Sequence, residues 1–243
     1  MKGMVLAAGQ GSRLRPLTNK TPKVLLPVGG VPVIVHIIAW LRHHGVDDLV
    51  INISHLGDRI RTALGDGASL GVRITYSPEK EPLGTAGGVK RAAAFFDGPF
   101  VVAYGDVLTD FDLSAMQRFH REKAAAATLA ILKVERPRPA GVVEMDADSR
   151  IIRFAEKPQD RHPTQDLENA GVYILEPSVL PHIPASGRPD FGADVFPQLL
   201  RRGLPVFGYV LGQNDHLIDI GSLEKYQQAD ANVRSGQMRV YSA

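Results

Sequence analysis

Met4-Val5-Leu6-Ala7-Ala8 runs directly into Gly9-Gln10-Gly11-Ser12-Arg13-Leu14-Arg15-Pro16-Leu17-Thr18-Asn19-Lys20-Thr21-Pro22-Lys23 near the start of this 243-residue chain. The first run is apolar throughout, which predicts a buried β-strand. The second run opens with glycines, which let backbone N–H groups approach an anion closely, and it carries four basic side chains and no acidic one. The two runs together predict a strand whose exit loop binds a polyphosphate.

Length and charge favour a functional loop over a simple tight connection. The loop over 9–23 is much longer than the roughly 2–6 residues that usually join a strand to a helix. The first acidic residue of the chain is Asp47, so no carboxylate in the neighbouring sequence balances the basic side chains. The whole chain has 28 basic and 26 acidic residues and a net charge of +2. The excess is therefore local and suits a small anion, whereas nucleic acid binding would require a broad basic face, so no nucleic-acid partner is expected.

Two common phosphate loops do not match this stretch. A P-loop would place Gly-Lys-Ser/Thr after a four-residue spacer, and none is present. A dinucleotide-binding loop would have its third glycine where Leu14 stands, Pro16 blocks an immediate helix, and no acidic residue follows about twenty positions on. A dinucleotide-dependent dehydrogenase is therefore disfavoured.

Apolar strands alternate with helical patterns along the first half of the chain. This alternation predicts an α/β fold with a doubly wound, mostly parallel sheet, which binds ligands at the carboxyl ends of its strands. The expected strands lie near 3–7, 48–53, 72–77 and 99–104, and the expected helices near 33–44, 57–65, 85–96 and 112–123.

The second half is less regular and is broken by several prolines. It is expected to extend the same sheet and to form a lid over its edge. Ser222 is expected to be the N-cap of the last helix, and residues 235–243 are expected to fray. The expected strands are 128–134, 141–145, 151–154, 169–175 and 205–210, and the expected helices are 194–201 and 222–234.

Two carboxylates follow apolar runs. Asp106 ends the run from Phe100 to Gly105, and Asp219 lies in His216-Leu217-Ile218-Asp219-Ile220-Gly221. A carboxylate at the carboxyl end of a strand is well placed to hold Mg²⁺ against phosphate oxygens, although an isolated Gly-Asp pair is equally typical of a turn.

The first loop resembles the signature of the sugar-1-phosphate nucleotidyltransferases, or nucleotide-sugar pyrophosphorylases. In this chain the signature reads Leu6-Ala7-Ala8-Gly9-x-Gly11-x-Arg13-Leu14-x-Pro16-Leu17-Thr18 and ends in Pro22-Lys23. Further matches follow in family order to about residue 230. The resemblance implies a Rossmann-like domain over 1–235, with a nucleotide-binding half at about 1–125, a sugar-binding half and lid at about 126–235, and a tail at 236–243.

The resemblance also implies a role for each matching residue. The chain departs from the family pattern at Leu217, where the family usually has a Trp two residues before the second carboxylate. The implied residues are, for the nucleotide, Leu6, Ala8, Gly9, Gly11, Ser12, Gly84, Thr85 and Gly87; for the sugar, Gly141, Glu156 and Asn169; for catalysis, Arg13, Lys23 and Lys157; and for Mg²⁺, Asp106 and Asp219.

The implied reaction joins an NTP to a sugar 1-phosphate, with release of pyrophosphate. The sequence of Glu81–Gly87, together with Phe154-x-Glu156-Lys157-Pro158, looks most like that of mannose-1-phosphate guanylyltransferases, which use GTP. Heptose-1-phosphate guanylyltransferases and the thymidylyl- or uridylyltransferases of glucose 1-phosphate or another sugar 1-phosphate share the same skeleton. A non-catalytic, nucleotide-sugar-binding regulatory subunit is the alternative from another class.

Composition sets the remaining expectations. The chain has no cysteine, which excludes disulfides and zinc–cysteine sites. It lacks an apolar stretch near the ~20 residues that cross a bilayer, and it begins with a strand instead of a leader. A cytoplasmic enzyme without a membrane partner is expected, and the oligomeric state stays open, a homo-oligomer included.

Overall fold

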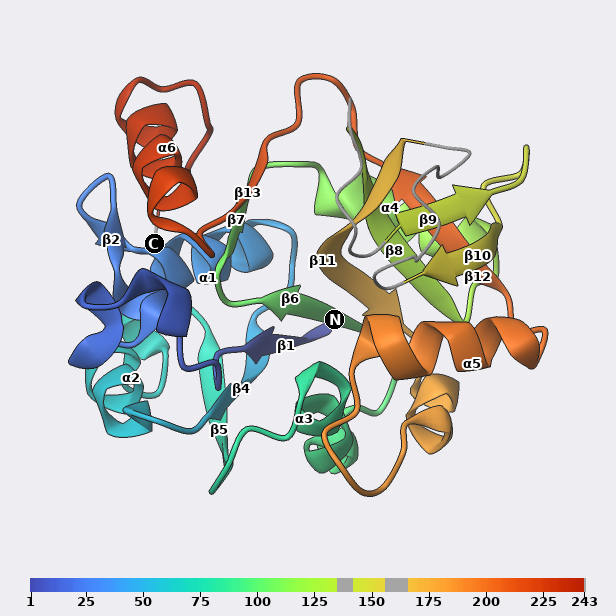
Figure 1. Ribbon diagram of the computed structural model, residues 1–243, viewed down its shortest axis with the longest axis horizontal. Helices are drawn as coiled ribbons and strands as arrows, with labels where there is room; N and C mark the ends of the chain where they lie inside the picture. The colour runs from blue at the N-terminus through green and yellow to red at the C-terminus, as the bar shows by residue number, and fades with distance from the viewer. Residues whose placement is uncertain (135–141, 156–165, 243) are drawn as a thin grey trace. The chain divides into compact units, whose positions relative to one another are not determined.

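The computed structural model describes residues 1–134, 142–155 and 166–242 (Figure 1). The chain forms two compact units that interleave in the sequence. The first unit contains Met1–Pro82, Ala103–Asp112 and Asn214–Ala243, and the second contains Leu83–Val102 and Leu113–Gln213. The division into nucleotide-binding and sugar-binding halves stays a prediction, because compactness alone assigns a ligand to neither unit.

Parallel strands form the centre of the first unit. β1 (Lys2–Leu6) pairs with β4 (Asp48–Ile53), which pairs with β5 (Arg73–Pro78). α1 (Val33–His43) and α2 (Gly57–Leu64) connect them, and α6 (Leu223–Arg234) comes from the end of the chain. The strands and helices expected in this part of the sequence are confirmed to within one or two residues.

The second unit is mainly antiparallel, with one parallel pair between β12 and β8. Its helices are α3 (Thr85–Arg91), α4 (Leu113–Glu122) and α5 (Phe196–Arg201). The chain passes from this unit into the first within β6 (Phe100–Tyr104). The other strands are β8 (Ala127–Lys133), β9 (Val142–Met145), β10 (Ile151–Ala155), β11 (Leu167–Leu175) and β12 (Val206–Val210).

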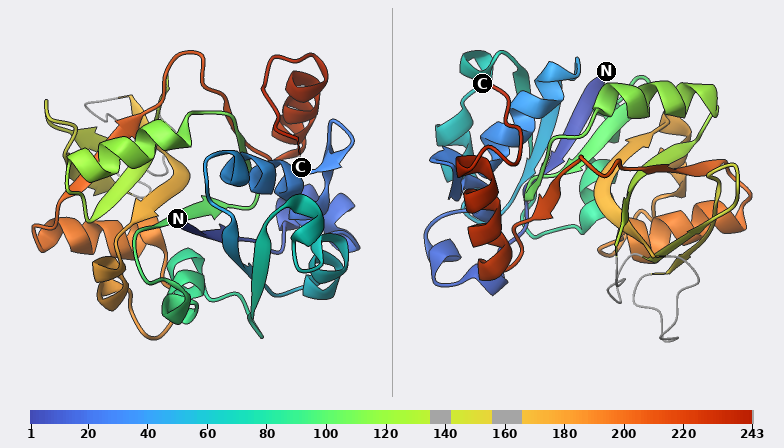
Figure 2. Two further views of the ribbon diagram at one scale, coloured as in Figure 1. Left: turned by 180° about the vertical axis from the view of Figure 1, so that it is seen from behind. Right: turned by 90° about the horizontal axis from the view of Figure 1, so that it is seen from above.

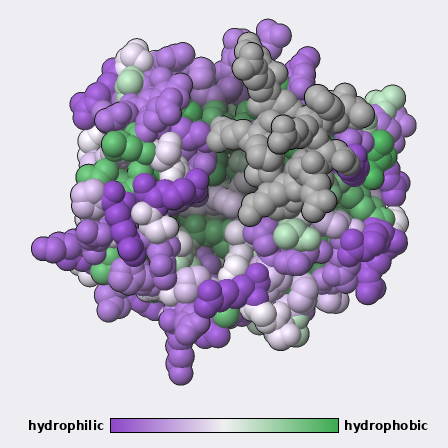
Figure 3. Space-filling model, viewed as in Figure 1, coloured by the Kyte–Doolittle hydropathy of each residue, from purple (hydrophilic) through white to green (hydrophobic). Residues whose placement is uncertain are grey.

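Helices lie on both sides of a mixed sheet, as the alternation of strands and helices predicted (Figure 2). The α/β class with a doubly wound, Rossmann-like sheet is therefore confirmed. Within the described residues, no helix has both the length and the apolar character needed to cross a membrane. Outside the atoms drawn in grey, the face in Figure 3 is mostly hydrophilic and carries several hydrophobic patches.

Several short elements were not predicted. The loop after β1 contains three single turns of 3₁₀ helix, Ser12–Leu14, Leu17–Asn19 and Lys23–Leu25. Two small antiparallel ribbons join β2 (Pro27–Val28) to β3 (Val31–Pro32) and β7 (Val107–Thr109) to β13 (Leu217–Asp219). Strands of two or three residues are too short to show the alternation by which strands are recognised in a sequence.

The expectation that residues 235–243 fray is wrong for the described residues of this segment. Met238 is only 1% exposed, and the ring of Tyr241 lies 4.3 Å from that of His43, measured between centroids. The backbone N–H of Arg239 donates to Asp110 Oδ2 at 3.0 Å. The local sequence around residues 235–243 could not reveal these partners, because His43 and Asp110 are far away in the sequence.

His120 gives the second unit a predicted pH dependence. His120 is 2% exposed, and its Nδ1 lies 2.8 Å from Thr128 Oγ1 and its Nε2 3.4 Å from Glu176 Oε1. Burial lowers the pKa of His120 below its usual 6.5, although the hydrogen bond to Glu176 acts in the opposite direction. The unfolded chain therefore takes up a proton at a higher pH than the folded chain. The stability that depends on neutral His120 is complete above about pH 6.5 and is lost as the pH falls toward the lower, folded pKa.

We expect the His120→Gln variant to lose less of its unfolding free energy than the wild type between pH 7 and pH 5. Urea denaturation of both proteins at pH 7, 6 and 5 measures the difference. His44, whose pKa is also lowered mainly by burial, is present in both proteins, so the comparison isolates His120. Equal pH slopes for the two proteins would contradict the prediction.

Candidate active site

The loop that follows β1 folds back on itself at Gly11. This residue has φ +63°, and a Cβ there would lie 3.0 Å from both Lys23 Cβ and Thr18 Cγ2. The Thr18 hydroxyl donates to the Gly11 carbonyl at 2.8 Å. Leu14 is buried beneath the loop, while Ser12 and Arg13 are exposed. The missing side chain at Gly11 thus lets the two ends of the loop meet, and the neighbouring side chains face solvent.

A buried polar network holds the backbone where β1 ends. Asn52 Oδ1 accepts from the Ala7 N–H at 2.8 Å, and Asn52 Nδ2 donates to Glu79 Oε1 at 2.8 Å. Asn52 is 3% exposed and Glu79 is 6% exposed. The network joins the carboxyl ends of three parallel strands and fixes Leu6–Ala8. Sequence reasoning missed both residues, although a polar Asn within the apolar run Leu49–Ile53 was a usable signal.

The ribbon of β7 and β13 brings the two predicted metal carboxylates to one end of the same small element. Asp219 pairs with Val107, and the Ile220 N–H donates to the Asp106 carbonyl at 3.0 Å. Asp106 also forms an ion pair with Lys23, and these side chains are 18% and 14% exposed. All of these residues belong to the first unit.

The opposite end of the ribbon is closed by Asp110 and His216. The His216 N–H and Nδ1 lie 2.7 Å and 3.0 Å from the Asp110 carboxylate, and Thr109 Oγ1 donates to the His216 carbonyl at 2.8 Å. These contacts fix the register of the ribbon, and therefore the relative position of the backbones that carry Asp106 and Asp219.

Arg13 and Asp219 converge at Gly221. A Cβ built at Gly221 would lie 2.8 Å from Arg13 Nη2 and 2.8 and 3.0 Å from the two carboxylate oxygens of Asp219. Lys225 approaches the same carboxylate, with Nζ 3.4 Å from Asp219 Oδ2. The predicted cations Arg13 and Lys23 thus lie beside the predicted carboxylates Asp219 and Asp106. Lys225 is an additional cation that sequence reasoning did not assign. Leu217 lies opposite Thr109 in the ribbon.

The donor set fits a hard divalent cation that arrives with phosphate. Asp106 and Asp219 offer carboxylate oxygens, the ligands that Mg²⁺ prefers. Among the residues that the structure describes, no group of three or more His, Cys, Asp or Glu side chains could hold a metal ion. Mg²⁺ is usually held by one or two carboxylates together with phosphate oxygens and water, which suits the pair of Asp106 and Asp219.

In the second unit, the predicted base-binding segment packs against residues 188–190. Gly84 has φ +84°, and a Cβ there would lie 2.5 Å from the Pro189 carbonyl oxygen. That oxygen accepts from the N–H groups of Ala86 and Gly87 at 3.0 and 3.3 Å. The Thr85 hydroxyl donates to Asp190 Oδ2 at 2.7 Å. Thr85 and Gly87 therefore hold the segment in place, and sequence reasoning missed their partners Pro189 and Asp190.

Asn169 lies in an irregular part of β11. The register between β11 and β8 shifts between Asn169 and Tyr173, and Gly171 has φ +74°. Asn169 Nδ2 donates to the Tyr173 hydroxyl at 2.8 Å, and its Oδ1 accepts from the Gly171 N–H at 3.2 Å. These bonds fix the Asn169 side chain. The predicted residues Gly141, Glu156 and Lys157 lie outside the described residues.

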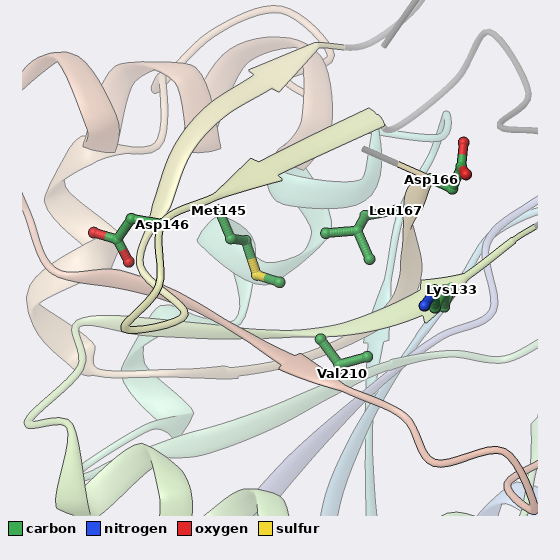
Figure 4. A pocket seen from close by; sticks show the side chains of 6 residues that line it. All are labelled: Lys133, Met145, Asp146, Asp166, Leu167 and Val210. Atoms are coloured by element: carbon green, nitrogen blue, oxygen red, sulfur yellow. The ribbon is translucent and has the colours of Figure 1, made fainter. Parts of the chain in front are cut away.

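A hollow of about 400 Å³ in the second unit is lined by none of the predicted residues that the structure describes (Figure 4). Its centre is apolar, with Met145, Leu167 and Val210, and carboxylates stand at its edge. Two carboxylates against one lysine suit an anionic ligand poorly. The full lining is Lys133, Met145, Asp146, Asp166, Leu167 and Val210.

The chain is similar to known proteins over nearly its whole length. The family model of the nucleotidyl transferases matches residues 2–236. A UTP–glucose-1-phosphate uridylyltransferase of Synechocystis is 39% identical over 98% of this chain and 65% of its own length. A mannose-1-phosphate guanylyltransferase of Mycobacterium tuberculosis is 34% identical over 96% of this chain and 64% of its own. The chain thus spans just under two thirds of the length of these relatives.

One solved structure has the same fold over nearly the whole chain. It is a candidate glucose-1-phosphate thymidylyltransferase of Bacillus anthracis, in complex with sucrose. The superposition has a TM-score of 0.86 and covers 96% of this chain and 95% of the other, with 28% sequence identity.

Proposed function

Because the chain belongs to the nucleotidyl transferase family, we propose that it transfers a nucleotidyl group from an NTP to a sugar 1-phosphate. The products are an NDP-sugar and pyrophosphate. The observation that carries the proposal is the convergence, within the first unit, of Arg13 and Lys23 with Asp106 and Asp219 beside the glycine loop. Cations on the loop and carboxylates on the ribbon are the groups that a metal–triphosphate complex requires.

The chemistry requires little of the protein beyond position and charge. The phosphate oxygen of the sugar 1-phosphate attacks the α-phosphorus, the bond to the β-phosphate oxygen breaks, and pyrophosphate leaves in line. A phosphate monoester is already anionic at neutral pH, so no general base is needed. Catalysis then depends on holding two anions together and on neutralising the charge that spreads over the phosphoryl oxygens.

Each candidate residue has a proposed role in this scheme. Arg13 and Lys23 bind the triphosphate, since Arg can bind two phosphate oxygens at once and Lys acts as a compact charge. Lys157 binds the attacking phosphate. Asp106 and Asp219 would hold Mg²⁺, which supplies positive charge to the phosphate oxygens when bound.

Backbone and side-chain contacts complete the proposed site. We assign the base to the segment that packs on Pro189, which contains Gly84, Thr85 and Gly87. The contacts with the rest of the nucleotide and with the sugar are proposed from the resemblance. They are Leu6, Ala8, Gly9, Gly11 and Ser12 for the nucleotide, and Gly141, Glu156 and Asn169 for the sugar.

For the substrates we propose GTP and mannose 1-phosphate. The sequence of Glu81–Gly87 favours assignment as a guanylyltransferase, and guanylyltransferases are among the relatives at 34% identity and above. The uridylyltransferase relative, at 39% identity, makes UTP and glucose 1-phosphate the second candidate pair. Heptose 1-phosphate and dTTP complete the set of alternatives. A cytoplasmic location, the lack of nucleic-acid and membrane partners, and any homo-oligomer stay predictions.

Pyrophosphate release with Mg²⁺ tests the proposal directly. We expect a grid of GTP, UTP, dTTP, ATP and CTP against mannose, glucose and heptose 1-phosphates to give its strongest signal with GTP and mannose 1-phosphate. Addition of EDTA is expected to abolish the signal, because the site relies on a metal to neutralise the phosphates. A stronger signal with another pair of substrates would support the same reaction with different substrates. Nucleotide binding without pyrophosphate release from any pair would favour the regulatory subunit.

A further inference from the structure

Lys225 occupies a position where a helix normally favours an acidic side chain. Ser222 caps α6, and its hydroxyl accepts from the Lys225 N–H at 3.3 Å, which makes Lys225 the third residue of the helix. Glu and Gln are preferred at this position, because the amino terminus of a helix carries a partial positive charge. Local helix stability therefore gives no reason for a lysine here.

Several contacts other than that of the Lys225 side chain hold α6 in the first unit. The Tyr226 hydroxyl donates to the Pro27 carbonyl at 2.7 Å, and Asp230 Oδ1 accepts from the Gly29 N–H at 2.7 Å. Gly29 also packs so closely on the helix that a Cβ there would lie 2.5 Å from Val233 Cγ1. The helix thus has anchors in the first unit that are independent of the Lys225 ammonium.

The Lys225 ammonium instead faces a candidate metal ligand. Its Nζ lies 3.4 Å from Asp219 Oδ2, and the two side chains are 24% and 36% exposed. The pairing of Lys23 with Asp106 repeats this arrangement at the other carboxylate. With Arg13 beside Gly221, three cations thus surround two carboxylates. A metal bound to both carboxylates would replace Lys23 at Asp106 and Lys225 at Asp219. The two ammonium groups would then be available to the anionic phosphates.

We propose that Lys225 exchanges partners during the reaction cycle: it neutralises Asp219 in the metal-free protein and binds a phosphate oxygen of the substrate when the metal takes Asp219. Lys225 thereby couples metal binding to nucleotide binding. It weakens the affinity of the empty site for metal and strengthens the affinity of the metal-loaded site for nucleotide. This inference rests on the proposed nucleotidyl transfer and adds a nucleotide-binding residue to it.

Metal and nucleotide binding can be measured without turnover. Free Mn²⁺ is followed by electron paramagnetic resonance without nucleotide, and GTP and UTP are titrated by calorimetry with Mn²⁺ but without sugar 1-phosphate. We expect the Lys225→Met variant to bind Mn²⁺ alone about two- to fivefold more tightly, the range of a partly exposed ion pair. We expect its nucleotide affinity with Mn²⁺ to fall about tenfold, because a charge-assisted hydrogen bond is lost.

Two further variants complete the test. Lys225→Arg keeps the charge and should return both affinities toward the wild type, whereas Arg59→Met removes an exposed charge from α2 and should change neither. If Lys225→Met does not fold, Lys225→Gln takes its place in both titrations.

Two outcomes would overturn the exchange. Unchanged Mn²⁺ affinity would show that Lys225 does not compete for Asp219. Tighter Mn²⁺ binding with unchanged nucleotide affinity would reduce Lys225 to a counter-ion. Failure of the proposed function would be recognised separately: the wild-type protein would release no pyrophosphate with any pair of NTP and sugar 1-phosphate.

Discussion

Replacement of Lys23 by alanine is expected to lower turnover by about 10²–10³-fold, the usual effect of removing one preorganised group that stabilises transition-state charge. The Lys23 side chain is held between the turn at Gly11 and the Asp106 carboxylate, so its ammonium is already in position before any substrate binds. The cost of fixing its long side chain is thus met during folding and not during the reaction.

The Lys23→Ala measurement is the rate of pyrophosphate release at saturating substrates, with circular dichroism to verify the fold. Lys80→Ala, which removes an exposed lysine of the same unit, is the matched control and should keep wild-type turnover. A purified, folded Lys23→Ala protein with unchanged turnover would remove Lys23 from the mechanism.

Gly221→Ala is expected to lower kcat/KM by about 10- to 100-fold while the protein still folds. The added methyl carbon would lie 2.8 Å from Arg13 Nη2 and 2.8 Å from an Asp219 carboxylate oxygen, so at least one of these groups must move. Both are the ends of flexible side chains, and therefore the backbone need not change. A displacement of about 1 Å in a catalytic arrangement can cost as much as 100-fold in rate.

Gly98→Ala is the control for this substitution. A Cβ at Gly98 would have no heavy atom within 4 Å, so the same chemical change there should leave kcat/KM unaltered. The two variants are compared by steady-state kinetics and by their urea midpoints. If Gly221→Ala keeps wild-type kinetics, Arg13 and Asp219 do not need their observed positions for the reaction.

The sequence predicted the regular elements of this protein because their patterns are long enough to read. β1, β4 and β5 are apolar runs with helical patterns between them, and both features come from burial in a parallel sheet. The ribbon of β7 and β13 could not be predicted in the same way. Its strands have three residues each and are separated by more than a hundred residues, so no local pattern connects them.

The candidate site likewise has a part that could be predicted from the sequence and a part that could not. The glycine loop and its basic side chains could be read directly from the residues, since their chemistry lies in one continuous segment. The association of Asp106 with Asp219 was expected only from the family resemblance, and the structure puts their backbones side by side. Lys225 and the network of Asn52 and Glu79 were missed, because their partners are defined by tertiary contacts alone.

The interleaving of the two units has a consequence for protein synthesis. When the ribosome has made the chain as far as Gln213, every residue of the second unit has been polymerised, whereas the first unit still lacks Asn214–Ala243. Asp219, Gly221 and His216, the partner of Asp110 in the ribbon, all belong to that missing segment. The glycine loop is therefore synthesised before the whole of the second unit, whereas the carboxylate of Asp219 is synthesised after it. A growing chain cannot assemble the candidate metal site until the whole second unit has been synthesised and the chain has passed Asp219.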